Sequence, residues 1–302
     1  MLLLQANLAQ GVIQQIAFGI STGAIYASLA LALVLIYRAM DVANFAQGEL
    51  AMFSTFIAWS MINYWHLPYF AVLVLTILIS FGAGVVIERV MIRRFEGAPV
   101  LTLVIVTLGL FSIVNGTAGL IWQYIFKAMD SPFPPNPIVV GGVFIATIQD
   151  VGVVAVTLAV LGVMFVFFRF TKLGLAMRAA SLYPETSRLL GVRTSWMLAL
   201  GWGMSAAVGA VSGMMVAPIV FLDPNMMQPV LLFAFAGAVL GGIESPVGAV
   251  VGSVIVGVLL ALLGRYVPGG FNLRTFFALV VIVGVLLLRP SGLFGRAEVR
   301  RV

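Results

Sequence analysis

The polar side chains that could act on a ligand are few, and most of them are neutral. Asn44 and Gln47 lie in the segment DVANFAQGE, just before an apolar run. Thr107 and Asn115 lie in another apolar run, about two helical turns apart and so on roughly one helix face. Such groups can line a polar path through a membrane, but they can equally cap a helix or bond to a neighbouring helix.

Two acids stand next to apolar runs, Glu49 just after Gln47 and Glu244 in a later segment, and both have a structural interpretation. Glu49 is expected in the first turn of a helix, where an acid suits the helix dipole, or in a pair with Arg38. Glu244 is likewise expected to be structural.

Enzyme chemistry has no visible basis in this sequence. The chain has no Cys, which excludes disulfides, thiol catalysis and Cys metal sites. Its single His, His66, stands beside Trp65 at the end of an apolar run, so we expect an interfacial role. There is no glycine-rich phosphate loop followed by Lys-Ser/Thr, and no nucleophile–base or metal constellation.

Composition indicates an all-α polytopic membrane protein. Hydrophobic residues make up 62% of the 302 positions and charged residues 9%, whereas soluble domains carry about 25% charged residues. The basic residues lie at the ends of apolar segments rather than along a stripe. Membrane lipid is therefore an expected partner, and nucleic acid is not.

Apolar runs predict eight or nine transmembrane or re-entrant helices. A run to Tyr64 follows Glu49, and residues 229–240 are too short for an upright span, which predicts a half-helix or re-entrant segment. The remaining predicted spans are 12–37, 70–87, 101–126, 151–168, 196–220, 247–263 and 271–288.

Basic residues orient these segments, because they concentrate on the cytoplasmic side. The orientation that puts most of them inside has an external N-terminus and a cytoplasmic C-terminus. It makes residues 127–150, with their four prolines, an external loop with a hairpin turning at Gly141-Gly142. The residues placed inside are Arg38, Arg89, Arg93, Arg94, Arg169, Lys172, Arg178, Arg188, Arg193, Arg289, Arg296, Arg300 and Arg301. Those placed outside are Lys127, Arg265 and Arg274.

The one long polar interval, residues 169–194, predicts two short cytoplasmic helices. Residues 173–181 favour a helix, and Pro184 with Glu185 is typical of a second helix start. Gly191 then indicates the stop of that helix. Such a loop either lies on lipid headgroups or is contacted by a partner.

Glycine spacing predicts a tightly packed bundle with close helix approaches. The small-xxx-small pairs are Gly19/Gly23, Gly209/Gly213, Gly237/Gly241 and Gly248/Gly252. The segments 44–49 and 242–248 each interrupt an apolar run and each hold an acid, a weak repeat of the kind that marks transport sites. No chain of charged residues crosses the spans, so a partner is expected to supply the energy.

Three segments resemble the ABC importer permeases for branched-chain amino acids. YRAMDVANFAQGELAM at 37–52 is similar to their N-F-A-H-G-[DE] region. GLAMRAASLYPETSRLLGV at 174–192 resembles their cytoplasmic loop G-x-A-x-R-A…P-E-x-x-x-L-L-G, and LGGIESPVGAVVG at 240–252 resembles their motif G-G-x-x-[ST]-P-x-G-A-x-x-G. The matches occur in order and cover nearly the whole chain.

The resemblance implies one permease domain, residues 1–302, in a bacterial-type inner membrane. It implies a complex of two permeases, identical or homologous, with two ATPases and an extracytoplasmic solute-binding protein. ATP and Mg would bind the ATPases, and this chain would hold no cofactor or metal and catalyse no reaction. Within the cytoplasmic coupling loop at 169–194, the residues expected to dock on the ATPase are Pro184, Glu185, Arg188, Leu189, Leu190 and Gly191.

The substrate is left open by the sequence. Gln47 stands where the family usually has His, and the family includes permeases for urea, other amino acids and organic acids. A branched-chain or related amino acid is the first expectation, with urea, an amide or a small organic acid as the alternative. A self-sufficient carrier or channel is the alternative of a different class.

The charge distribution yields a test of orientation. A cysteine introduced at Ser131 should react with an impermeant thiol reagent in intact cells, and one at Ser181 should be protected. The native chain has no Cys to interfere. The opposite labelling pattern would overturn the orientation.

Overall fold

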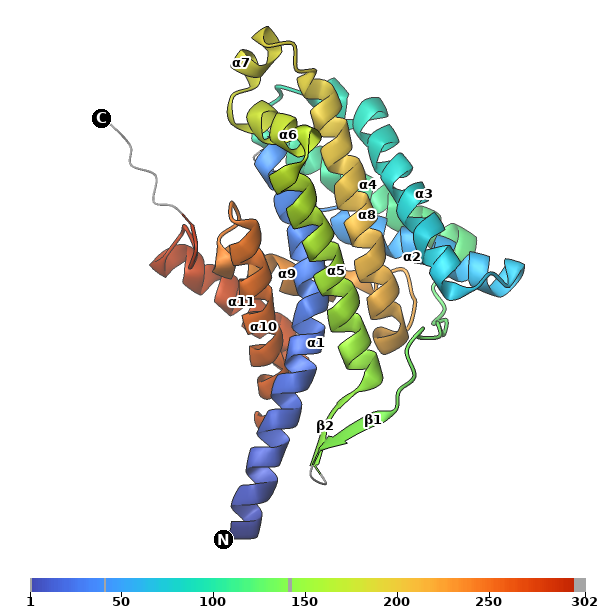
Figure 1. Ribbon diagram of the computed structural model, residues 1–302, viewed down its shortest axis with the longest axis vertical. Coiled ribbons are helices and arrows are strands. Elements are labelled where there is room, and N and C mark those ends of the chain that lie inside the picture. Colours follow the sequence, from blue (N-terminus) through green and yellow to red (C-terminus); the bar gives the residue numbers. More distant parts are fainter. Residues whose placement is uncertain (1, 41, 141–142, 296–302) are drawn as a thin grey trace. The chain divides into compact units, whose positions relative to one another are not determined.

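The computed structural model describes residues 2–40, 42–140 and 143–295 (Figure 1). Arg296, Arg300 and Arg301, placed inside by the charge argument, and Gly141-Gly142 lie outside the described residues. The elements are α1 (Leu2–Met40), α2 (Gln47–Trp65), α3 (Tyr69–Val90), the 3-10 helix η1 (Ile92–Phe95), α4 (Val100–Trp122), β1 (Pro137–Val140), β2 (Val143–Thr147), α5 (Ile148–Phe170), α6 (Lys172–Leu182), α7 (Pro184–Leu189), α8 (Thr194–Val220), α9 (Met227–Gly241), α10 (Pro246–Tyr266) and α11 (Gly270–Leu288).

The described helices confirm an all-α polytopic membrane protein. Seven of them are long and apolar enough to cross a membrane: α1, α3, α4, α5, α8, α10 and α11. The helix α9 is apolar but has only 15 residues. At about 1.5 Å per residue it is shorter than the roughly 30 Å of a bilayer core.

The chain divides into two compact units. The first contains residues 1–30, 131–158 and 229–302, and the second contains residues 31–130 and 159–228. The helices α1, α5 and α9 each contribute residues to both units.

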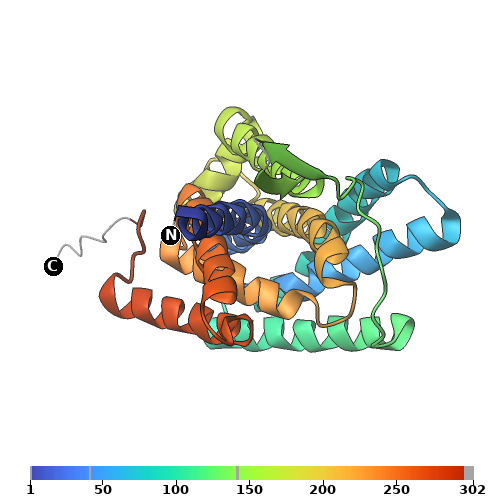
Figure 2. The ribbon, with the colours of Figure 1, turned by 90° about the horizontal axis from the view of Figure 1, so that it is seen from below.

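The second unit is built around α8. The helices α3 and α2 pack against α8, and α4 packs on α2 (Figures 1 and 2). Figure 2 shows α4 from its side and α8 nearly along its axis, so these two helices cross. Buried apolar side chains including Trp202, Leu50 and Leu110 fill the space between the helices.

Close helix approaches in this unit depend on glycine. Gly213 of α8 lies against the Ala51 carbonyl and Thr55 of α2, and Gly209 lies against the Gln47 side chain. Any Cβ at these positions would overlap the neighbouring helix, which confirms the packing role predicted for this pair.

The first unit uses the other predicted glycine pairs. Gly19 and Gly23 of α1 lie on the backbone of α10, at Val258 and Val254. The remaining two pairs bring α9 and α10 together, with Gly241 against the Gly248 carbonyl. Apolar residues of α9, α10 and α11, such as Phe233, Leu260 and Ile282, form the core beside them.

The hairpin predicted for residues 127–150 is present. β1 pairs antiparallel with β2, with Val140 opposite Val143 and an irregularity between Ile138 and Val139. The structure differs from expectation just before this loop. The predicted span 101–126 ends at Trp122, because Gln123 has a φ of 65° and Lys127 pairs with Leu222 in an isolated β-bridge.

The packing of α3 on α8 yields a stability prediction. A Cβ on Gly84 would lie 2.6 Å from the Trp202 carbonyl oxygen, whereas a Cβ on Gly82 meets nothing within 4 Å. Overpacking of this kind costs about 1–3 kcal/mol, so Gly84→Ala should lower the melting temperature of the purified protein in detergent. Gly82→Ala on the same helix is the matched control, and its melting temperature should equal or exceed that of the wild type. Equal melting temperatures for the two variants would contradict this packing.

Candidate functional site

The first polar group surrounds the start of α2. The Asn44 Oδ1 accepts the backbone N–H of Ala46 at 3.0 Å, and the Asn44 carbonyl accepts that of Gln47 at 3.1 Å. The Asn44 side-chain amide also donates to the Gln47 Oε1 at 3.3 Å. Asn44 therefore satisfies backbone N–H groups where α2 begins, which is a role the sequence left open.

Gln47 connects three segments of the second unit. Its side chain is fully buried, and its Nε2 donates to the Ser205 carbonyl of α8 at 3.0 Å. The Ser205 hydroxyl lies 2.9 Å from the Gln47 Oε1 and 2.7 Å from the Ala32 carbonyl of α1, and it can donate to one of them at a time. Gly209, one turn further along α8, leaves room for the Gln47 amide.

These contacts place the beginning of α2 far from the ends of α8. Ser205 is roughly 16 Å along α8 from Thr194, at about 1.5 Å per residue. Helix ends at such a depth are tolerated only where protein groups replace water as hydrogen-bond partners. The Asn44–Gln47–Ser205 contacts supply those partners.

A second polar group lies around Asn115 of α4. Its Nδ2 is 3.0 Å from the Glu49 Oε2, 2.9 Å from the Pro224 carbonyl and 3.3 Å from the Asn225 Oδ1. Its Oδ1 accepts the hydroxyl of Tyr124 at 3.0 Å. The group thus joins the first turn of α2 to the segment between α8 and α9.

The four predicted path residues do not form one cluster. The structure brings Asn44 to Gln47, and it brings Asn115 to Glu49 instead. Thr107 is buried and donates to the Val104 carbonyl of its own helix. The path-lining role of these residues stays a prediction.

Sequence reasoning missed Ser205, Asn225 and Gln228. Gln228 belongs to the second group, since its Nε2 donates to the Asn225 Oδ1 at 2.9 Å. Ser205 and Gln228 are single polar residues beside apolar runs, and Asn225 belongs to the turn Asp223-Pro-Asn225, which are the only signals that could have selected them.

The interval between α5 and α8 folds into the two short helices predicted for it. Thr171 caps α6 by accepting the backbone N–H of Gly174, and α7 opens at Pro184 with Glu185 in its first turn. Gly191 has a φ of 82° and ends the turn after α7, as expected. Leu189 and Leu190 are 89% and 79% exposed, so this end of α7 presents an apolar surface.

Arg188 connects α7 to neighbouring segments of the second unit. Arg188 pairs with Glu96 at 3.6 Å and with Glu185 at 3.4 Å, and its Nε donates to the Thr194 hydroxyl at 2.9 Å. Figure 1 shows α6 and α7 beside the first turns of α8.

Arg93 neutralises a buried acid. It contacts both carboxylate oxygens of Glu88, at 2.9 and 3.3 Å, and donates to the Ser195 carbonyl at the start of α8. The sequence indicated a charged helix end here, but nothing in it showed that Glu88 is buried.

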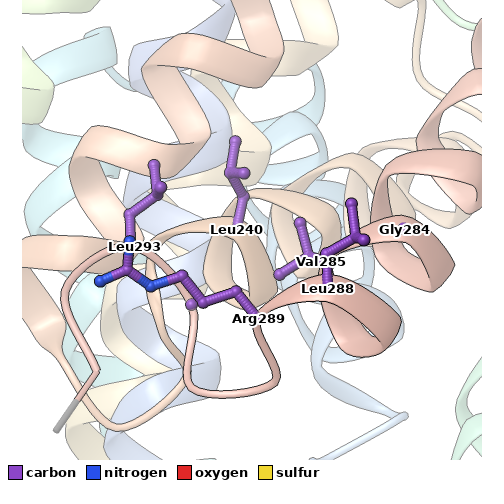
Figure 3. A pocket seen from close by; sticks show the side chains of 7 residues that line it. Leu240, Gly284, Val285, Leu288, Arg289 and Leu293 are labelled. Atoms are coloured by element: carbon purple, nitrogen blue, oxygen red, sulfur yellow. The ribbon is translucent and has the colours of Figure 1, made fainter.

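A pocket of about 110 Å³ lies in the first unit, and none of the predicted site residues lines it (Figure 3). It is lined by Leu240, Gly284, Val285, Leu288, Arg289, Gly292 and Leu293. Only Arg289 among these has a polar side chain, so the pocket offers no acceptor side chain for a polar solute.

The helices, the buried polar groups and the exposed short helices together define a multi-pass membrane protein. A family model for the branched-chain amino acid transport system permease component matches residues 15–286. The chain therefore belongs to this family of transport permeases.

Individual relatives agree with this assignment. The high-affinity branched-chain amino acid transport system permease protein LivH of Salmonella typhimurium is 30% identical over 304 residues, which cover 96% of this chain and 97% of the relative. The corresponding protein BraD of Pseudomonas aeruginosa is 29% identical, with 96% of this chain and 98% of the relative covered.

One solved structure was also found to be similar, PsaBC from Streptococcus pneumoniae in complex with Fab. It has a TM-score of 0.43 and 15% identity, and the match covers 94% of this chain and 92% of that chain.

The Gln47 contacts yield a test that separates structure from transport. Gln47→Leu removes the acceptor of the Asn44 side-chain amide and the second donor to the Ser205 carbonyl, and leaving a buried polar group unsatisfied costs about 1–3 kcal/mol. We expect a lower melting temperature in detergent. Combined with Ser205→Ala, its effect should be non-additive, because the two side chains share one hydrogen bond. An unchanged melting temperature with lost transport would contradict this structural role and support the path-lining role instead.

Proposed function

We propose that this chain is the membrane-spanning permease subunit of an ATP-driven importer for a branched-chain or related amino acid. The observation that carries this proposal is the family match over residues 15–286. Relatives named as branched-chain amino acid permeases align over nearly their whole length, which supports the substrate class.

The same proposal assigns partners and cofactors. Two ATPase subunits bind ATP and Mg and perform the hydrolysis, a second permease subunit completes the membrane domain, and an extracytoplasmic binding protein delivers the solute. This chain catalyses no reaction and binds no cofactor. Residues 1–302 act as one permease domain in a bacterial-type inner membrane, with the N-terminus external and the C-terminus cytoplasmic.

In this proposal, α2 and α9 complete a domain of eight or nine membrane segments. Both are shorter than the apolar helices beside them in sequence, and the contacts of Gln47 with Ser205 support a start of α2 within the membrane. Discontinuous helices near the midplane are a recurrent feature of transport sites.

The coupling surface is proposed to be the end of α7. Leu189 and Leu190 are exposed apolar side chains next to the charges of Glu185 and Arg188. Apolar anchors dominate most protein interfaces, and rim charges contribute less. Because Arg188 also pairs with Glu96, force on α7 can reach the loop after α3 without unfolding of the short helix.

A second substrate class is retained for a specific reason. Gln47 stands where the permeases that this sequence resembles usually have His, so urea, an amide or a small organic acid is the alternative solute. A self-sufficient carrier is the less favoured function.

Replacing the apolar anchor tests the coupling surface. Leu190→Asp should reduce co-purification of the ATPase more than Arg188→Ala does, because it removes an anchor and buries a charge. Thr186→Asp is the matched control, since it adds the same charge to the exposed side of α7 and keeps both leucines. Wild-type co-purification for Leu190→Asp would remove this surface from the mechanism.

The helix stop provides a second variant in the same experiment. Gly191 has a positive φ and open space around its Cα, so Gly191→Val strains the backbone without a clash. We expect lower receptor-stimulated ATP hydrolysis in reconstituted membranes, with solute binding to the receptor unchanged. Gly191→Asn, which tolerates positive φ, should retain most of the stimulation.

A further inference from the structure

Glu49 is a buried carboxylate in the first turn of α2. Its side chain is only 1% exposed. Its Oε2 accepts an N–H from the Asn115 side chain at 3.0 Å, and the carboxylate also has a side-chain hydrogen bond with Gln228. An ionised carboxylate has about four lone-pair sites, and burying it is costly unless a positive charge or several donors compensate.

The same chain shows how it compensates a buried acid when the role is structural. Glu88 is fully buried, and Arg93 binds both of its oxygens. Among the residues that the structure describes, no Lys or Arg is found in an ion pair with Glu49, and the ion pairs found there include those of Arg93 and Arg188. The two buried glutamates of this unit therefore differ in the presence of a counterion.

The surroundings of Glu49 are polar but neutral. Asn115, Asn225 and Gln228 supply amides, and Tyr124 supplies a hydroxyl. The Asn115 amide has two hydrogens for three acceptors, the Glu49 oxygen, the Pro224 carbonyl and the Asn225 oxygen. The donors around the carboxylate are thus already shared.

We infer that Glu49 binds the ammonium group of the transported amino acid, with Asn115 holding the carboxylate in place until the ligand arrives. The inference rests on the proposed function and names the contact that would select its substrate. An ammonium group carries three donors and the missing positive charge, and the carboxylate is an acceptor-only partner for it. In the structure, the Asn115 N–H occupies the position at Oε2 that an ammonium N–H would take.

This assignment separates the candidate solutes. A zwitterionic amino acid or an amine satisfies Glu49, whereas an organic acid without an amino group is repelled by it. A neutral amide such as urea can donate to the carboxylate but carries no positive charge. Its transport should therefore not depend on the negative charge of Glu49. Glutamine in place of Glu49 keeps the shape and removes only the charge.

The test uses the full complex with its ATPase and binding protein, reconstituted in vesicles with ATP supplied. Glu49→Gln should lower leucine uptake more than tenfold while the melting temperature stays within the range of the wild type. Glu244→Gln, the same change at an exposed acid of the segment between α9 and α10, is the matched control and should leave uptake unchanged. Uptake within twofold of the wild type for Glu49→Gln would overturn the assignment.

A second measurement needs no variant and applies even where Glu49→Gln does not fold. Isopentylamine and 4-methylpentanoate share the side chain of leucine but keep only the amino or only the carboxyl group. Titrated calorimetrically into the purified permease–ATPase complex without the binding protein, the amine should bind and the acid should not. Equal binding of the two, or binding of the acid alone, would overturn the assignment.

Two further results distinguish this inference from its alternatives. An inorganic cation is the other source of positive charge, and amine binding that disappears when NaCl is replaced by choline chloride would assign Glu49 to that ion instead. A wild-type complex that transports no amino acid overturns both the inference and the proposed function. A wild-type complex that transports leucine together with an equally active Glu49→Gln variant overturns the inference alone.

Discussion

The structure of the second unit depends on satisfying the polar groups at the beginning of α2. A helix that starts beside the middle of α8 leaves backbone N–H groups where water is scarce. Asn44 accepts from Ala46, and the Gln47 carboxamide is bonded in turn to Ser205. Because these side chains come from different helices, α2 and α8 are tied in one register.

The glycines on α8 are a consequence of the same constraint. Gln47 can reach the backbone of α8 only because Gly209 has no side chain in its way, and Gly213 lets α2 approach one turn further on. A buried amide without a hydrogen-bond partner would destabilise the unit more than the close helix packing stabilises it. The polar contacts and the small residues therefore act together.

The two buried glutamates show how charge is distributed along the unit. Glu88 with Arg93 fixes the end of α3 to the start of α8, near the short helices that we propose as the ATPase contact. Glu49 lies next to neutral amides from three separate segments. A structural acid with its counterion and an acid without one are thus about 40 residues apart in a chain in which only 9% of residues are charged.

Local features of this fold were predictable from the sequence, and long-range ones were not. Pro184 and Gly191 mark the beginning and the end of α7, because their backbone preferences are local. The glycine pairs indicated contact faces, because their spacing follows the helix period. The end of α4 at Trp122 was not predictable, since apolar residues continue to Phe126 and the pairing of Lys127 with Leu222 involves a distant segment. For the same reason, the sequence suggested Asn44, Gln47 and Asn115 but could not supply their partners Ser205, Asn225 and Glu49.

The central claim is that this chain moves an amino acid only when a partner hydrolyses ATP. Its most direct test is uptake of labelled leucine into vesicles that contain the permease, its ATPase and the binding protein, with ATP present or absent on the ATPase side. We predict uptake against a gradient with ATP, and none when ATP is withheld or the ATPase is left out. Concentrative uptake by the permease alone, driven by an ion gradient, would contradict the account.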